Sequence, residues 1–307
     1  MMARSAPMSA MAVALLITLA GTAQAQNGER LRAWLAARQA DGPQAPAGET
    51  IAYGRDPLQR LTLWRARNHT GPAPLIIFVH GGGWQRGDMA NATGRWKAVH
   101  YPATGYAFAS INYRLVPTAT VESQAQDVTM ALKALLARAD MLGIDRRRVV
   151  LMGHSAGAHL VALVGTDERH LQAAGLSLAD VAGIIPIDGA AYDVPAQLAQ
   201  AGPRMRQTYA QAFGDEPARQ RALSPIAHAA APNAPAFLLL HVQRPDGVAQ
   251  NRALAAALRA AGTSVEVASI PGEGLMGHME VNRRLGDPAY AGTAPVDAWL
   301  RARLGGR

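Results

Sequence analysis

The chain has 307 residues, of which 49% are hydrophobic and 17% are charged. This length and balance exclude a polytopic membrane protein and a mostly disordered chain, and they leave room for a large buried core. Because the sequence contains no cysteine, disulfide frameworks, thiolate metal sites and cysteine nucleophiles are excluded as well.

The formal net charge of +8 raises the question of an acidic partner. Nearly all of the excess is arginine, and the arginines are scattered along the chain, the longest run being residues 146–148. A nucleic-acid-binding protein gathers its basic residues on one face and interleaves them with aromatic side chains. We therefore expect a basic surface exposed to water and no nucleic-acid partner.

The first 25 residues have the pattern of a secretory signal peptide. Arg4 is the only charged residue in this stretch, an apolar run follows at 11–20, and Ala23-Gln-Ala25 supplies the small residues of a cleavage site. The apolar run is shorter than the ~20 residues that span a bilayer. The sequence predicts cleavage before Gln26, a periplasmic or secreted mature protein, and no stable membrane anchor after cleavage.

Strands and helices are predicted to alternate along residues 26–307. Residues 50–53 and 58–66 are expected to form an antiparallel hairpin, and the apolar runs at 75–79 and 107–113 are typical of strands buried on both faces. Further strands are predicted at 149–152, 181–187, 237–242 and 265–270, and helices at 121–139, 156–164, 248–260 and 296–303. This alternation predicts one α/β domain whose mostly parallel sheet is covered by helices on both faces.

Residues 189–234 interrupt the alternation. They are rich in proline, alanine and glutamine, they are weakly helical in pattern, and they lie between two predicted strands. A long insertion at such a place usually forms a lid or cap over a site. We therefore expect a small cap within the single domain at 26–307.

The strongest motif is Gly153-His-Ser155-Ala-Gly157, which joins a predicted strand to a predicted helix. This is the context of a nucleophile elbow, in which a serine occupies a sharp and strained turn above the sheet. The two glycines let the strand and the helix approach closely, and the start of the helix favours negative charge beside Ser155. Ser155 is therefore the predicted nucleophile.

A second motif, His80-Gly-Gly-Gly-Trp84, follows the apolar strand at 75–79. Acyl transfer passes through an oxyanion that needs hydrogen-bond donors aimed at it. The backbone N–H groups of Gly82, Gly83 and Ala156 are the predicted donors. The spacing does not fit a phosphate-binding glycine loop, and His80 is expected to act as a structural hydrogen-bonding residue.

A serine nucleophile needs a general base, and the base needs a carboxylate that orients it. In this architecture the carboxylate and the histidine follow the serine along the chain. Among the nine histidines, only His278 is expected in the loop after the last predicted strand, where it can reach Ser155 from the edge of the sheet. His154 and His159 flank the elbow and are expected to be packed neighbours.

Two aspartates are candidates for the orienting carboxylate. Asp246 follows the predicted strand at 237–242, and Asp188 follows the one at 181–187. Both strand ends are used for the acid in this architecture, and the later one is the commoner place. Asp246 is therefore the predicted acid, and Asp188 is the alternative, its other interpretation being a turn carboxylate before Gly189.

The motifs at 80–84 and 153–157 together resemble those of the α/β-hydrolase superfamily. More narrowly, the chain is similar over about residues 50–304 to hormone-sensitive-lipase-like carboxylesterases and to kynurenine-formamidase-like bacterial hydrolases. The resemblance implies an α/β-hydrolase fold and a defined set of site residues. The implied triad is Ser155, Asp246 and His278, and the implied oxyanion donors are Gly82, Gly83 and Ala156.

These residues predict a carboxylesterase-type serine hydrolase that cleaves small-molecule esters through an acyl-enzyme, with no metal and no cofactor. An arylformamidase or a short-peptide hydrolase with the same triad is the alternative within the enzyme class. A non-catalytic binding protein of the hydrolase fold is the alternative outside it. Such proteins usually lose the nucleophile or the base, whereas this sequence retains Ser155 and His278.

Overall fold

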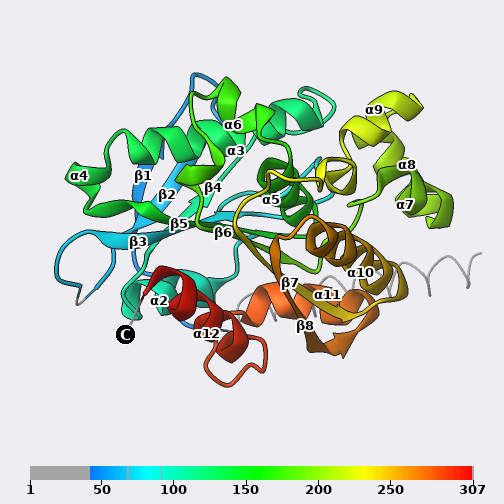
Figure 1. Ribbon diagram of the computed structural model, residues 1–307. Helices are drawn as coiled ribbons and strands as arrows, with labels where there is room; N and C mark the ends of the chain where they lie inside the picture. Colours follow the sequence, from blue (N-terminus) through cyan, green and yellow to red (C-terminus); the bar gives the residue numbers. More distant parts are fainter. Residues whose placement is uncertain (1–41, 68, 91, 306–307) are drawn as a thin grey trace, which may run out of the picture. The chain divides into compact units, whose positions relative to one another are not determined.

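The structure is a computed structural model that describes residues 42–67, 69–90 and 92–305 (Figure 1). The predicted signal peptide at 1–25 lies outside these ranges. Within them, no helix combines the length and the apolar character needed to cross a membrane.

The described residues form eight paired strands and a set of helices that alternate with them. The strands are β1 (Glu49–Ala52), β2 (Arg60–Trp64), β3 (Ala73–Val79), β4 (Ala107–Ile111), β5 (Ile144–His154), β6 (Gly183–Ile187), β7 (Ala236–Gln243) and β8 (Ser264–Glu273). The helices are α2 (Arg95–Ala103), α3 (Val121–Leu136), α4 (Ala139–Leu142), α5 (Ala156–Thr166), α6 (Arg169–Ala173), η1 (Leu178–Asp180), α7 (Val194–Gln200), α8 (Pro203–Phe213), α9 (Pro217–Ala222), η2 (Pro225–His228), α10 (Pro245–Ala260), α11 (Gly274–Arg284) and α12 (Thr293–Leu304).

The sheet is mostly parallel, as predicted. Its strand order is β1-β2-β4-β3-β5-β6-β7-β8. β1 pairs antiparallel with β2, and β2 pairs antiparallel with β4, so the predicted hairpin forms one edge of the sheet. All the remaining pairs in this order are parallel.

The two faces of the sheet are covered by different helices. In β3, Leu75, Ile77 and Val79 join one hydrophobic cluster, whereas Ile76 and Phe78 join the other, as the two-residue period of a strand requires. The first cluster also contains buried side chains of α3, α5 and α10, and the second contains those of α2, α11 and α12 (Figure 1). Every residue of β3 is buried, which explains why its apolar run is continuous.

The chemistry-bearing residues gather where the parallel strands end. β3 leads into His80, β5 ends just before Ser155, β6 leads into Asp188, and β7 leads into Arg244. Neighbouring parallel strands have their carboxyl ends at the same edge of a sheet, and ligands bind in the crevice there. Segments separated by tens of residues in sequence therefore lie together at this edge.

Residues 189–234 contain α7, α8, α9 and η2, which Figure 1 shows grouped together near α10. The side chain of Asp193 caps α7 by accepting a hydrogen bond from the N–H of Ala196 at 3.1 Å. Prolines begin α8 and α9, where the fixed backbone angle of proline suits the first helical turn. Arg219 of α9 pairs with Glu122 of α3 at 2.8 Å and so ties the insertion to the main domain.

Candidate active site

Ser155 lies at the turn between β5 and α5, in the place predicted for a nucleophile elbow. Its φ of +56° lies in the left-handed region, which costs a residue other than glycine about 1–2 kcal/mol. The backbone N–H of Ser155 donates to the carbonyl of Ile187 at 3.0 Å, which ties this turn to β6. A side chain at Gly153 would overlap the Gly157 carbonyl, and one at Gly157 would overlap the Val79 carbonyl, so the turn requires glycine at both positions.

The glycine-rich loop after β3 lies directly against the elbow. A Cβ atom at Gly81 would lie 3.0 Å from the Cβ of Ser155. Gly82 and Gly83 have φ values of +130° and +62°, and a side chain at Gly82 would overlap the carbonyl of Arg86. The backbone of this loop can therefore approach Ser155 because three successive residues lack side chains.

His80 is a structural residue, as expected from its place in the loop. Its Nδ1 lies 2.7 Å from the carbonyl oxygen of Gly81, and its ring stacks on Tyr113 with 4.4 Å between centroids. The Tyr113 hydroxyl donates to the backbone carbonyl of His80 at 2.9 Å. Burial lowers the pKa of His80 to about 4, so this imidazole is neutral at physiological pH.

His278 lies in the second turn of helix α11, and the predicted loop position is wrong. β8 runs to Glu273 and α11 begins directly at Gly274, whose φ of +53° permits the change of direction without a loop. Nδ1 of His278 lies 2.5 Å from Oδ2 of Asp188. A carboxylate oxygen accepts this bond, so Nδ1 carries the proton and Nε2 keeps a lone pair for proton transfer.

His154 connects the elbow to α11. It precedes Ser155, and its Nε2 lies 2.9 Å from the backbone carbonyl oxygen of His278. The two imidazole rings lie 4.4 Å apart between centroids. Burial, followed by the nearby His278, lowers the pKa of His154 well below its ordinary value, so the ring is neutral and its Nε2–H donates to the carbonyl. The residue beside Ser155 thus fixes the backbone of the predicted base.

Asp188, and not Asp246, is the carboxylate that contacts His278. The Asp188 side chain is fully buried, and it accepts hydrogen bonds from His278 Nδ1, from the Val242 N–H at 3.1 Å and from Arg244 Nε at 3.1 Å. Its φ of +43° marks a turn directly after β6. The sequence also predicts a turn before Gly189, and this turn directs the Asp188 carboxylate at His278.

Asp246 occupies a different position from the one predicted. It lies in the first turn of α10, where its carboxylate accepts bonds from Arg244 at 3.0 Å and from Gln197 at 3.3 Å. Its side chain is 32% exposed, whereas that of Asp188 is 0% exposed. Because Pro245 starts α10 so soon after β7, Asp246 lies on that helix. Arg244 occupies the space beside Asp188 instead.

The ionised form of Asp188 is held by its neighbours. Burial by itself raises the pKa of this carboxyl, but the hydrogen bond from His278, the charge of Arg244 and the Val242 N–H together lower it below its ordinary value. The charged carboxylate therefore persists beside His278, where it can stabilise a protonated imidazole.

The insertion contacts the glycine-rich loop through aromatic side chains. Trp84, the last residue of the loop motif, packs edge-on against Phe213 and Tyr209 of α8, with centroid distances of 4.8 and 5.9 Å. A Cβ atom at Gly83 would lie 3.0 Å from Thr208 Cγ2 of the same helix. The cap predicted at 189–234 therefore lies against the loop that carries the predicted oxyanion donors.

His159 holds the elbow helix, the loop and the insertion together. Its Nδ1 accepts a hydrogen bond from Trp84 Nε1 at 3.4 Å, and its Nε2 lies 2.8 Å from the carbonyl oxygen of Leu223. Burial lowers the pKa of His159 to about 4. The neutral tautomer that satisfies both bonds carries its proton on Nε2, so His159 is the packed neighbour that the sequence predicts.

The sequence does not predict the contacts of Arg244. Its guanidinium lies between Asp188 and Asp246, at 3.1 and 3.0 Å. The only sequence signal was its position after a predicted strand and directly before Pro245, which is too general to assign a contact.

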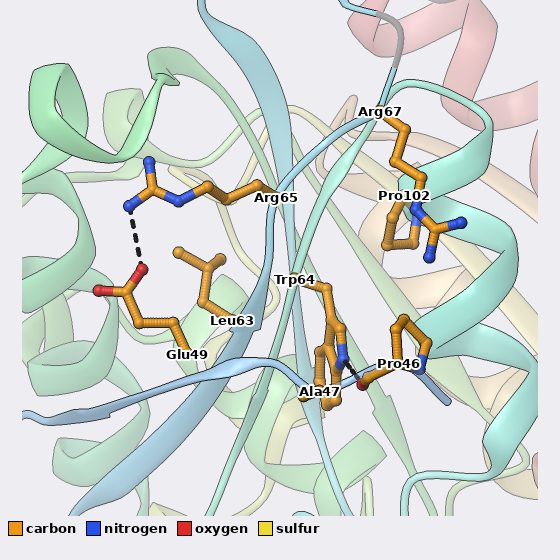
Figure 2. A pocket seen from close by; sticks show the side chains of 8 residues that line it. All are labelled: Pro46, Ala47, Glu49, Leu63, Trp64, Arg65, Arg67 and Pro102. Carbon is orange, nitrogen blue, oxygen red and sulfur yellow. Dashed lines mark hydrogen bonds and ion pairs between the residues drawn. The ribbon is translucent and has the colours of Figure 1, made fainter. Parts of the chain in front are cut away.

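A pocket away from these residues lies at the antiparallel edge of the sheet (Figure 2). Pro46, Trp64 and Arg67 are among its lining residues, and Trp64 Nε1 donates to the Pro46 carbonyl at 2.7 Å. The pocket contains no serine or histidine, and it is not the candidate site. In the described ranges, no three histidine, cysteine, aspartate or glutamate side chains are arranged to hold a metal ion.

The family model described as BD-FAE matches residues 61–258, more than half of the chain. Esterase LipC of Mycobacterium tuberculosis is 39% identical over 116 residues, which is 38% of this chain and 28% of LipC. Kynurenine formamidase of Drosophila melanogaster is 32% identical over 116 residues, which is 37% of this chain and 36% of that protein. The chain thus spans well under half the length of these curated relatives.

Among solved structures, esterase B from Lactobacillus rhamnosis is similar with a TM-score of 0.71 and 23% identity. The similarity covers 94% of this chain and 93% of that protein. At this level of identity the comparison concerns the fold, and it confirms the predicted α/β-hydrolase fold. The names of these relatives agree with the predicted class of enzyme.

Proposed function

Since the chain belongs to the BD-FAE family and has the α/β-hydrolase fold, we propose that it is a serine hydrolase that cleaves carboxylic esters of small molecules. The nucleophile is Ser155, the general base is His278, and the orienting carboxylate is Asp188. The backbone N–H groups of Gly82, Gly83 and Ala156 stabilise the oxyanion.

The reaction proceeds in two halves. Ser155 Oγ attacks the ester carbonyl while Nε2 of His278 takes its proton, and the Asp188 carboxylate stabilises the imidazolium that forms. The tetrahedral intermediate collapses when His278 returns the proton to the alcohol, which leaves an acyl-enzyme. Water then attacks the acyl-enzyme with the same base, and the carboxylic acid is released.

One observation carries this proposal above the others. Nδ1 of His278 is bonded to a buried carboxylate, and the backbone of His278 is bonded by His154, the residue next to Ser155. The first bond fixes the tautomer that a general base requires, and the second fixes its backbone beside the elbow. A histidine with a purely structural role would not need both a buried carboxylate partner and a backbone bond to the residue beside the strained Ser155.

The test compares wild type and Ser155→Ala in two measurements, ester hydrolysis and labelling by a fluorophosphonate probe. We expect the wild-type chain to hydrolyse p-nitrophenyl butyrate and to be labelled, and Ser155→Ala to do neither while it keeps the wild-type melting temperature. Ser264→Ala, at an exposed position of β8, is the matched control and should behave like the wild type. Labelling of folded Ser155→Ala at the wild-type level would contradict the proposal.

A formamidase is the second candidate, and the similarity to kynurenine formamidase of Drosophila favours it. The same three side chains would attack a formamide carbonyl, and the leaving group would be an aryl amine. Hydrolysis of N-formylkynurenine and of p-nitrophenyl butyrate by the same preparation separates the two. A kcat/KM for the formamide at least about tenfold above that for the ester would favour the formamidase.

We also propose that the chain is exported after cleavage before Gln26. The charge, apolar run and small residues at 1–25 support this proposal. N-terminal sequencing of the protein recovered from a secreting host tests it, and a mature protein that begins upstream of Gln26 would contradict it.

A further inference from the structure

Four charged or ionisable side chains follow one another at the carboxyl edge of the sheet. His278 Nδ1 and Arg244 Nε both contact Oδ2 of Asp188, at 2.5 and 3.1 Å. A second nitrogen of Arg244, Nη1, contacts Oδ2 of Asp246 at 3.0 Å. The signs of charge alternate along the row when the imidazole is protonated: positive, negative, positive, negative.

We propose that Arg244 and Asp246 are positioning residues of the hydrolase: Arg244 holds Asp188 against His278, and Asp246 holds Arg244 and balances its charge. The inference rests on the proposed function, because it assigns roles relative to the triad of Ser155, His278 and Asp188. Neither residue touches the reacting atoms, and both act through Asp188.

The geometry supports a positioning role for Arg244. Asp188 receives three donors, namely His278 Nδ1, Arg244 Nε and the Val242 N–H, so the rotation of its carboxylate is fixed. A guanidinium is planar and presents donors on more than one edge. Arg244 uses this shape to contact Asp188 with one edge and Asp246 with another.

The carboxylate of Asp246 offsets the positive charge of Arg244. A cation beside Asp188 opposes protonation of His278, and protonation of His278 is what the transition state requires. A second carboxylate beyond the guanidinium offsets that effect. Asp246 is itself held by Gln197, whose Nε2 lies 3.3 Å from Oδ2 and whose side chain is buried.

The other ionisable groups around His278 do not reproduce this arrangement. On α11 itself Arg283 and Arg284 both pair with Glu280. His154 of β5 and Lys97 of α2 contact residues of α11, and burial lowers the pKa of both well below their ordinary values. Tyr192, beyond β6, has a pKa raised by burial and then by Asp188, so it is neutral. Arg244 and Asp246 are therefore the charges whose removal should change the pH dependence of the activity.

The decisive experiment is the pH profile of kcat/KM for Arg244→Gln and Asp246→Asn, measured with p-nitrophenyl butyrate on the full chain. In Arg244→Gln, which removes the cation, the acid limb of the kcat/KM profile should move to higher pH. In Asp246→Asn, which removes the outer carboxylate, it should move to lower pH. Each shift should be roughly half a pH unit. The double variant Arg244→Gln/Asp246→Asn should lie between the two. A purely structural role would lower kcat in both variants without shifts of opposite sign.

Two further variants complete the test. Arg244→Lys keeps the charge and loses the planar fork, so its acid limb should return toward that of the wild type while kcat stays reduced several-fold. Arg65→Gln removes a comparable arginine from an ion pair with Glu49 at the far edge of the sheet, and its profile should coincide with the wild type. Active-site titration with the fluorophosphonate probe normalises each kcat to the folded, competent fraction.

The possible failures are distinguishable. Absence of ester and formamide hydrolysis in the wild type, or activity in Ser155→Ala, contradicts the proposed function. An active wild type whose Arg244→Gln and Asp246→Asn profiles coincide with it, or shift in the same direction, contradicts the roles of Arg244 and Asp246 alone.

Discussion

Nδ1 of His278 lies 2.5 Å from Oδ2 of Asp188, although 90 residues separate the two along the chain. β6 lies beside β5 in the sheet, so the turn after β6 brings Asp188 next to the strand that carries Ser155. α11 follows β8, the edge strand two places from β6, and brings His278 to the same place. The contact therefore joins two segments that only the folded sheet brings together.

Asp188→Asn should be nearly inactive, and Asp246→Asn should remain active. An amide at position 188 favours the wrong imidazole tautomer and cannot stabilise imidazolium, which costs about 10⁴-fold in kcat in the analogous change in a serine protease. We expect Asp246→Asn to keep kcat within about tenfold of the wild type, because it acts only through Arg244. The measurement is kcat with p-nitrophenyl butyrate, with melting temperatures recorded for both variants. An active Asp188→Asn beside an inactive, folded Asp246→Asn would restore Asp246 as the acid.

The glycine-rich loop at 80–84 should tolerate a methyl group at Gly83 better than at Gly82. At Gly82 a Cβ would overlap the backbone carbonyl of Arg86, whereas at Gly83 it meets a threonine methyl at 3.0 Å. We expect Gly82→Ala to lose about a hundredfold or more in kcat, the cost of a misplaced oxyanion donor, and Gly83→Ala to lose less.

Gly175→Ala is the matched control for the loop variants. Gly175 has a φ of +74° with no atom near its missing Cβ, so the change adds backbone strain of about 1–2 kcal/mol without moving a donor. Its melting temperature should fall and its kcat should not. Equal kcat in Gly82→Ala and Gly175→Ala would place the oxyanion donors elsewhere.

The stability of the protein in acid should depend on Asp188. A carboxyl whose native pKa lies below its unfolded value, about 4, stabilises the fold above that pH, and the contribution is lost as the pH falls through the native pKa. The free energy of unfolding should therefore decrease more steeply from about pH 5 to about pH 3 in the wild type than in Asp188→Asn.

Ser155→Ala is the control for this measurement, because it abolishes catalysis but keeps Asp188. The free energy of unfolding of Ser155→Ala, measured by urea unfolding at each pH, should fall with pH as it does in the wild type. Parallel curves for Asp188→Asn and the wild type would mean that the native environment does not favour the ionised carboxyl.

Short acyl groups should be the preferred substrates. Trp84, Tyr209 and Phe213 are buried against one another where the insertion meets the glycine-rich loop. The helices α7, α8 and α9 are short, with 7, 11 and 6 residues. We expect higher kcat/KM for p-nitrophenyl acetate to hexanoate than for the palmitate. A preference for long-chain triglyceride emulsions over soluble butyrate esters would contradict this.

The architecture and the turn around Ser155 could be predicted from the sequence alone. The strand at 75–79 is a continuous apolar run because both faces of the sheet are covered, and such runs predict buried parallel strands without further information. The glycines around Ser155 and in the loop at 80–84 were equally informative, because close backbone approach allows few other residues. These features arise from a few neighbouring residues, so they can be recognised in a short stretch of sequence.

The carboxylate that contacts His278 could not be predicted from the sequence and emerges from the packing of the strands and helices. Asp188 and Asp246 both follow parallel strands, and the sequence contains no measure of how far each side chain lies from a histidine on a third element. Pro245 starts α10 immediately and keeps Asp246 on that helix, whereas the left-handed turn at Asp188 directs its carboxylate toward His278. Arg244 then occupies the space between the two aspartates. Contacts of this kind depend on the order of strands in the sheet and on backbone angles at single residues, which hydrophobic periodicity does not encode.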